Sequence, residues 1–240
     1  MTPRVNFSIL LYNAKVMTVL VIPPNDPEAV QIWLIAKAMG MPIVRSGQAH
    51  GANLDREKRL FEKLEKDGAG RVVIVEMPGV ATEEKLRQAG YDVVIIDHHE
   101  YTGLDRARNP KTGRILPSSL EQFLKLFRLS DEKLAALGFD PRMVRGIGVL
   151  DRGFVWALRD EGWSWKEIER LLGYQEELMA MVRNRTHEAK KMAVVKKIWE
   201  NRRPWKGFFI VEGDTEMSLR VRISLVAALD RKKPTPLIVN

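Results

Sequence analysis

The sequence YDVVIIDHHEY, residues 91–101, decides how the rest of the chain is interpreted. Its four consecutive β-branched residues, 93–96, are typical of a fully buried strand in a parallel sheet. Asp97, His98 and His99 follow at once, at the carboxyl end of that strand, where open α/β sheets bind their ligands. One carboxylate and two imidazoles suit Mn, Fe or Zn, although adjacent side chains on an extended chain point to opposite sides.

The N-terminal part of the chain alternates short apolar runs with helical patterns. The predicted strands are 17–22, 42–44, 72–75 and 93–96, and the predicted helices are 29–39, 55–66 and 82–89. Strands that alternate with helices indicate βαβ units and a parallel sheet. The sequence therefore predicts an α/β fold, with a parallel sheet that has helices on both faces, a helical connector and a small C-terminal α/β piece.

The C-terminal part is interpreted as a connector and a small domain. Residues 174–200 have apolar residues at helical spacing and contain no Gly or Pro, which predicts one long helix. A linker is expected at 201–206, followed by a strand at 208–211, a helix at 216–229 and a strand at 237–239. The predicted domains are an α/β domain at 1–173, a connecting helix and linker at 174–203, and a small C-terminal α/β domain at 204–240.

The composition limits the class of protein. The chain has 240 residues, 45% of them hydrophobic and 29% charged, which fits an ordinary globular protein of one or two domains. Its net charge of +8 favours anionic partners such as nucleotides or nucleic acid. The absence of cysteine excludes disulfides and thiolate metal sites. No apolar run reaches the roughly 18–20 residues of a membrane span, so we expect a cytoplasmic protein without a membrane partner.

Acidic residues recur where the predicted strands end. Asp26 and Glu28 follow the first strand, Glu76 ends the third, and Asp151 lies in the glycine-containing segment GIGVLDRG. The carboxyl ends of parallel strands share one rim, so these carboxylates and the residues 97–99 could converge there. Converging carboxylates repel one another unless cations neutralise them. A pair of metal ions about 3.5–4 Å apart does so, and activates water in phosphoester hydrolysis.

The order of these motifs resembles the DHH phosphoesterase superfamily, over about residues 16–160. This superfamily includes RecJ-like exonucleases, nanoRNA and pAp phosphatases, cyclic-dinucleotide phosphodiesterases and exopolyphosphatases. VVIIDHHEY, residues 93–101, is the most specific part of the resemblance. PSSLEQFLKLF, residues 117–127, resembles the helix start after the triad, and GIGVLDRGF, residues 146–154, resembles the fourth motif.

The resemblance implies a phosphoesterase that uses Mn²⁺, as one or two ions, with Mg²⁺ as an alternative. Its substrate would be a phosphorylated small molecule, a nucleotide or a short oligonucleotide. The implied metal ligands are Asp26, Glu28, Glu76, Asp97, His98 and Asp151. His99 would stabilise the phosphate, and catalytic roles are expected for His99, Asp97 and Asp151. Arg145 and Arg152 either bind substrate phosphate bidentately or pair with nearby acids.

Several departures from the family pattern keep a second hypothesis open. Glu28 and Glu76 stand where the family usually has Asp, and no Gly-Gly-Gly-His motif is present. The alternative is a non-catalytic DHH-type scaffold that binds nucleic acid or a protein partner through a basic surface. Arg202 and Arg203 with Trp205 could bind a single strand or form a solvated linker. His50 is interpreted as a solvated loop residue, and the oligomeric state is not predicted.

Overall fold

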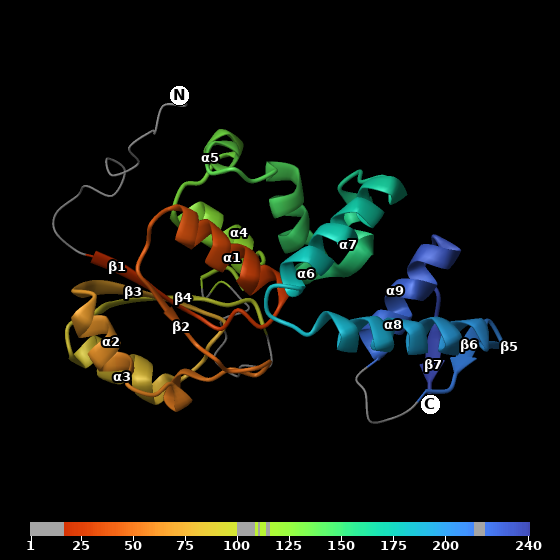
Figure 1. Ribbon diagram of the computed structural model, residues 1–240, viewed down its shortest axis with the longest axis horizontal. Coiled ribbons are helices and arrows are strands. Elements are labelled where there is room, and N and C mark those ends of the chain that lie inside the picture. Colours follow the sequence, from red (N-terminus) through yellow and green to blue (C-terminus); the bar gives the residue numbers. More distant parts are fainter. Residues whose placement is uncertain (1–16, 100–108, 110, 114–115, 214–218) are drawn as a thin grey trace. The chain divides into compact units, whose positions relative to one another are not determined.

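The computed structural model describes residues 17–99, 109, 111–113, 116–213 and 219–240. Glu100 and Tyr101, which end the stretch quoted first, lie outside the described residues. The chain divides into two compact units, Met1–Arg152 and Gly153–Asn240 (Figure 1). The boundary falls inside helix α6 (Pro141–Asp160), where Gly153 and Phe154 have non-helical backbone angles.

The N-terminal unit contains a parallel four-stranded sheet. Its strands are β1 (Met17–Ile22), β2 (Ile43–Arg45), β3 (Ala69–Val75) and β4 (Asp92–Ile96), in the order β2-β1-β3-β4. The side chains of residues 19–22 in β1 and 72–75 in β3 are completely buried. Such continuous apolar strands are typical of a parallel sheet that is covered on both faces. The predicted α/β class with a parallel sheet is confirmed.

Helices cover both faces of this sheet, as predicted. Helices α1 (Pro27–Ala38) and α4 (Ser119–Leu126) lie on one face, and α2 (Leu60–Lys66) and α3 (Val80–Gln88) lie on the other (Figure 1). The unit also contains a 3-10 helix, Leu54–Arg56, and helix α5, Asp131–Ala136. The core under α2 and α3 is formed by Val19, Val21, Val72, Ile74, Leu54, Leu64 and Leu86.

The strand order places a ligand-binding position between β1 and β3. After β1 the chain runs to β2 on one side, and it then returns to β3 on the other side of β1. In an open α/β sheet, ligands bind at the carboxyl ends of the two strands where this reversal occurs. Asp26 follows β1 and Glu76 follows β3, so the fold itself brings these acids to the rim of the sheet.

The C-terminal unit contains a three-stranded sheet and further helices. The strands β5 (Arg203–Trp205), β6 (Phe208–Val211) and β7 (Leu237–Val239) lie in sequence order. The helices are α7 (Trp165–Met179), α8 (Arg185–Glu200) and α9 (Arg220–Arg231). The strands expected at 208–211 and 237–239 are therefore confirmed. The first residues of the helix expected at 216–229 lie outside the described residues.

Two expectations about the connector are wrong. The single helix expected at 174–200 is divided, because α7 ends at Met179 and α8 begins at Arg185. The side chain of Asn184 caps α8 by accepting a hydrogen bond from the backbone N of His187 at 3.2 Å. The expected linker at 201–206 contains strand β5, because its residues pair with β6.

None of the described helices is long and apolar enough to cross a membrane.

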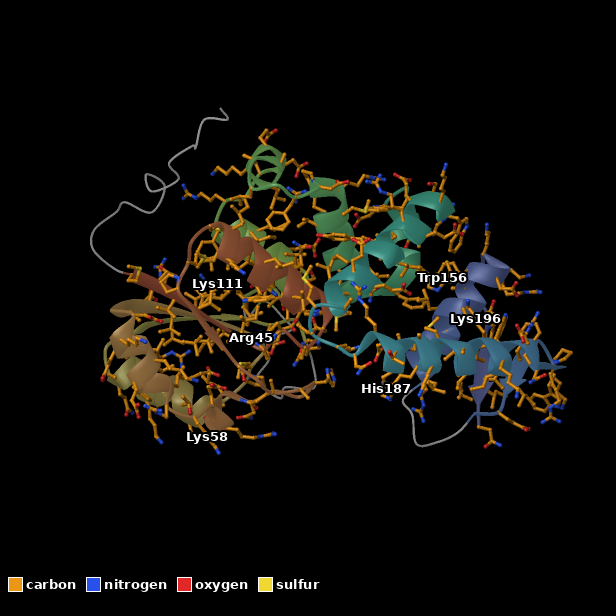
Figure 2. The ribbon with its side chains drawn as sticks, viewed as in Figure 1. Arg45, Lys58, Lys111, Trp156, His187 and Lys196 are labelled. Carbon is orange, nitrogen blue, oxygen red and sulfur yellow. The ribbon has the colours of Figure 1, made fainter. Side chains whose placement is uncertain are left out.

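The basic side chains come from many parts of the chain. Those labelled in Figure 2, Arg45, Lys58, Lys111 and Lys196, belong to different segments. Positive charge is therefore spread along the sequence, so net charge alone does not locate a binding surface.

Candidate metal centre

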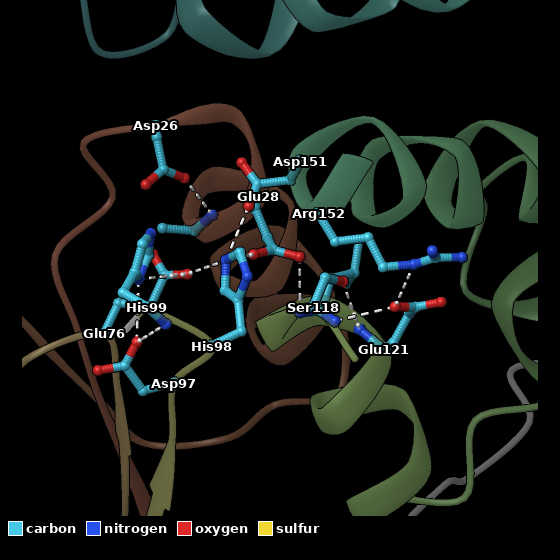
Figure 3. Close-up of polar contacts among 12 residues, drawn as sticks. Asp26, Glu28, Glu76, Asp97, His98, His99, Ser118, Glu121, Asp151 and Arg152 are labelled. Atoms are coloured by element: carbon cyan, nitrogen blue, oxygen red, sulfur yellow. Dashed lines mark hydrogen bonds and ion pairs between the residues drawn. The ribbon is translucent and has the colours of Figure 1, made fainter. Parts of the chain in front are cut away.

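The predicted metal-binding residues gather at the carboxyl ends of the strands in the N-terminal unit (Figure 3). Glu76 directly follows β3, and His98 lies two residues after β4. Glu28 is in the first turn of α1, and Asp151 comes from α6. Four segments that are distant in sequence therefore supply one site.

His98 lies at the centre of this group, between Glu28 and Glu76 (Figure 3). Its Nε2 atom is 2.8 Å from Asp151 Oδ2, 3.4 Å from Glu28 Oε2 and 3.5 Å from Glu76 Oε1. One donor atom from each of these four residues lies within 4.8 Å of the others. Three carboxylates around one imidazole nitrogen are more acceptors than a single N–H group can serve.

A second donor set overlaps the first. Glu76, His98 and His99 also offer atoms within 4.8 Å of one another, and His99 Nδ1 lies 4.0 Å from Glu76 Oε1. The two sets share Glu76 and His98. The structure thus confirms that the predicted residues include clusters that could hold a metal ion.

Asp97 occupies a different position, although it belongs to the same motif. Its Oδ1 accepts a hydrogen bond from the backbone N of His99 at 3.0 Å and lies 2.9 Å from His99 Nδ1. Gln122 Nε2 donates to the Asp97 carbonyl at 3.0 Å. The carboxylate of Asp97 therefore fixes the ring of His99, and a direct role in metal binding stays a prediction.

Asp26 lies at the entrance to α1. Its Oδ1 caps the helix by accepting a hydrogen bond from Ala29 N at 2.8 Å. Burial, followed by repulsion from Glu76, raises the pKa of Asp26 to about 8. Asp26 is not a member of either donor set among the described residues, but this repulsion shows that it shares the electrostatic environment of the cluster.

The acidic cluster attracts positive charge to its centre. Burial and then repulsion from Asp151 raise the pKa of Glu28 to about 7, and burial also raises the pKa of Glu76. Burial alone would lower the pKa of His98, but the surrounding carboxylates raise it to about 12. A proton on His98 therefore compensates part of the negative charge, and a divalent cation meets the same need more fully.

Several buried donor atoms in the cluster have no hydrogen-bond partner among the described residues. These atoms are Glu28 Oε2, Glu76 Oε1, Asp97 Oδ2 and His98 Nε2. Nε2 of His98 lies within 3.5 Å of three carboxylate oxygens, although it has at most one N–H to offer them. Buried polar atoms in folded proteins are nearly always bonded. A mixed oxygen and imidazole donor set of this kind fits a divalent metal ion.

Glu28 is held in place by the start of helix α4. Its Oε1 accepts a hydrogen bond from Leu120 N at 2.8 Å, while its Oε2 faces His98. Ser118 begins α4 with a capping box. A Cβ atom at Gly148 would lie 2.6 Å from Ser118 Oγ, so only glycine allows α6 to approach this closely.

Glu76 has an unusual backbone conformation. Its φ angle is 51°, in the left-handed region, and its N–H donates to the carbonyl of Ile96 at 2.9 Å. A residue other than glycine in this region costs on the order of 1–3 kcal/mol, and such strain is concentrated at functional sites. The backbone at the end of β3 is therefore strained at a residue of both donor sets.

We expect that replacing Glu28 and Glu76 together by aspartate weakens Mn²⁺ binding by about 10-fold or more. The shorter side chain at position 28 cannot reach both Leu120 N and the metal position. Calorimetric titration of Mn²⁺ into the wild-type and variant proteins measures the effect.

Glu83→Asp provides the matched control, because Glu83 is a buried glutamate of α3 that accepts a hydrogen bond from Gly79 N outside the donor sets. Tighter Mn²⁺ binding in the double variant would show that the longer side chains hold the site open.

The two arginines predicted to bind substrate have carboxylate partners. Arg145 pairs with Asp131 of α5 at 2.6 Å, and both side chains are about half exposed. Arg152 Nε donates to Glu121 Oε2 at 3.1 Å, next to the capping box of α4 (Figure 3). Arg152 thus lies beside the cluster, and the role of both residues in substrate binding stays a prediction.

A pocket of about 300 Å³ opens beside the cluster. Residues that line it include Asp26, His50, Asn53, Glu76, Asp97 and His99. His50 comes from the loop after β2, which Gln48 closes through two 3.0 Å hydrogen bonds with the backbone of Asn53. The sequence does indicate that this loop lies near the site, because β2 is predicted to belong to the parallel sheet and the loop after it must start at the same rim.

No protein-family model and no curated protein matches this chain. The function must therefore be inferred from the site and its surroundings.

Proposed function

We propose that this protein is a divalent-metal-dependent phosphoesterase of DHH type, which prefers Mn²⁺ and hydrolyses nucleotides or short oligonucleotides. The observation that carries the proposal is the pair of overlapping donor sets centred on Glu76 and His98. Buried donor atoms without a hydrogen-bond partner among the described residues lie in these sets, beside a pocket of about 300 Å³. The order of the motifs in the sequence, which resembles the DHH superfamily, supports the same reaction.

The metal would be held by Glu28, Glu76, His98 and Asp151. When bound, a divalent ion polarises a phosphoryl oxygen and activates water for attack on phosphorus. Mn²⁺ is favoured over Mg²⁺ because an imidazole takes part, whereas Mg²⁺ prefers oxygen ligands alone. Glu28 is oriented for this task by Leu120 N, which bonds to its other oxygen at 2.8 Å.

His99 would bind the phosphate of the substrate. It lines the pocket, and Asp97 Oδ1 lies 2.9 Å from its Nδ1 atom, which fixes the ring at the edge of the pocket where a phosphate would enter. Burial opposes charge on this ring, but Asp97 and Glu76 raise the pKa of His99. A fixed, protonated imidazole stabilises the negative charge that develops on the phosphoryl oxygens. Asp97 would thus act by positioning His99.

A substrate panel tests the proposed reaction. The protein is incubated with Mn²⁺ and with dinucleotides, pAp, cyclic dinucleotides, short single strands or polyphosphate, and products are separated by chromatography. We expect a Mn²⁺-dependent product from at least one of these compounds. The Asp151→Ala variant should form no product and should bind less metal. The Asp97→Ala variant should form no product because His99 is no longer held.

The scaffold hypothesis is the second candidate, and the net charge of +8 favours it. A scaffold requires only attraction to nucleic acid, and that attraction falls steeply with salt. Single-strand binding that survives both substitutions, with no product from any compound of the panel, would support the scaffold and contradict the phosphoesterase.

A further inference from the structure

The sheet of the C-terminal unit has one face that is covered by helices. Phe209 and Val211 of β6, with Leu237 and Val239 of β7, contact a core that α8 and α9 supply. The core residues from these helices are Val195, Ile198, Trp199, Ile223 and Ala227. Since side chains alternate along a strand, the intervening residues must point away from this core.

The opposite face carries exposed aromatic side chains. Trp205 pairs with Phe208 across β5 and β6, Arg203 pairs with Ile210, and Ile210 pairs with Ile238 of β7. These five residues define the open face of the sheet. Trp205 is 48% exposed, Phe208 is 42% exposed and Ile238 is 38% exposed. Large apolar side chains that gather on a surface mark a binding site.

A tight turn fixes the two aromatic residues relative to each other. Lys206 and Gly207 connect β5 to β6, and their φ angles of 43° and 86° are both positive. A two-residue turn with positive φ at both positions matches the twist of a β-hairpin. Trp205 and Phe208 therefore lie opposite each other at the end of a short, well-defined hairpin, with Lys206 Nζ 5.0 Å from the centre of the Trp205 ring.

Cations gather at the same end of the sheet. The backbone N of Phe209 donates to the carbonyl of Pro236 at 3.1 Å, which brings the connection between α9 and β7 next to the start of β6. Lys232 and Lys233 lie in this connection and are exposed. Lys206 of the turn is a third cation at this end of the sheet, and it is the one that contacts the Trp205 ring.

We propose that the open face binds single-stranded nucleic acid, with bases stacked on Trp205 and Phe208 and phosphates near Lys206, Lys232 and Lys233. Aromatic rings that stack bases next to cations that contact phosphates are the general means by which proteins hold single strands. A second copy of this chain is the competing occupant of the same face, and the oligomeric state of the variants below tests it. If the proposed function holds, the inference names an oligonucleotide as the substrate.

Fluorescence anisotropy with a labelled oligothymidylate tests the proposal, in EDTA so that no hydrolysis occurs. Loss of one stacked base corresponds to about 1–3 kcal/mol, so Trp205→Ala and Phe208→Ala should each weaken binding by roughly 5- to 150-fold. Trp205→Phe should retain most of the affinity, because it keeps a stacking ring. Lys232→Glu combined with Lys233→Glu should lower the magnitude of the slope of log K against log salt by about 1.4, because each phosphate contact to a single strand contributes about 0.7.

Val221→Ala is the matched control, because Val221 is an apolar residue of α9 that is 69% exposed and lies outside the open face. Unchanged binding in Trp205→Ala and Phe208→Ala would overturn the proposal. A shift from dimer to monomer in these variants, with binding unchanged, would instead assign the face to a second copy. Failure of this proposal can be told apart from failure of the phosphoesterase proposal. If only the phosphoesterase proposal fails, the substrate panel gives no product but the protein still binds the strand.

Discussion

Replacing His98 by alanine should abolish stoichiometric Mn²⁺ binding and lower hydrolysis by more than about 100-fold. His98 is the histidine that both donor sets share, and its Nε2 lies within 3.5 Å of three carboxylate oxygens. Substitution of residues that only support a metal ligand typically costs 10- to 100-fold in affinity or activity, so loss of a ligand itself should exceed that range. Metal analysis after Mn²⁺ loading and removal of free ions gives the stoichiometry.

The chain offers a matched control in His187→Ala. His187 lies in the first turn of α8 in the C-terminal unit, where its side chain is exposed (Figure 2). This variant should bind Mn²⁺ and turn over substrate like the wild-type protein. Equal Mn²⁺ content in His98→Ala and His187→Ala would contradict the assignment of the metal centre.

Replacing Glu28 by glutamine should have opposite effects on the metal-free and metal-bound proteins. Glutamine retains an oxygen for the hydrogen bond from Leu120 N but removes a completely buried negative charge. Folding raises the pKa of this carboxyl from 4.5 to about 7, so the folded protein holds this proton more tightly than the unfolded chain does. The free energy of unfolding of the wild-type protein therefore falls as the pH rises from 4.5 to about 7. At pH 8 without metal, we expect the variant to be more stable by roughly 1–3 kcal/mol.

Mn²⁺ should reverse that order. At a free concentration of 1,000 times Kd, a ligand that binds only the folded state adds about 4.1 kcal/mol, which exceeds the expected advantage of the metal-free variant, and this gain should be confined to the protein with an intact donor set. Thermal unfolding with and without Mn²⁺ measures both effects, and Glu83→Gln serves as the control for a buried glutamate outside the cluster. A metal-free variant that is less stable than the wild-type protein would show that the Glu28 carboxylate does not destabilise the unliganded site.

Features that depend on local sequence could be predicted. The apolar runs rich in β-branched residues predicted β1 with both of its ends correct. They predicted the C-terminal ends of β3 and β4 correctly and their N-terminal ends to within three residues. Once these strands are parallel, Glu76 and His98 must lie on the same rim. The parallel sheet also requires the loop after β2 to start at this rim, but which residue of that loop lines the pocket depends on the hydrogen bonds by which Gln48 closes the loop, so His50 could not be singled out.

Features that depend on competing local or long-range bonds were missed. The apolar spacing of residues 174–200 continues through the break between α7 and α8, but the side chain of Asn184 caps a new helix there. Strand β5 contains Pro204 and has only three residues, so its own sequence does not indicate a strand. Pairing with β6, which follows a two-residue turn, determines its conformation.

The hydrogen bond between Glu28 and helix α4 has a consequence for directed evolution. One carboxylate oxygen orders the start of a helix and the other faces His98, so a substitution at this position changes folding and metal affinity in one step. Gly148 and Ser118 are in close contact at the same place. A library that varies position 28 alone would therefore disturb the start of α4 in most of its members, whereas joint variation of positions 28, 118 and 148 would let the contacts at this helix start change together with the side chain that faces His98. Transfer of this centre to another protein would require the start of α4 and the glycine of α6 in addition to the ligands.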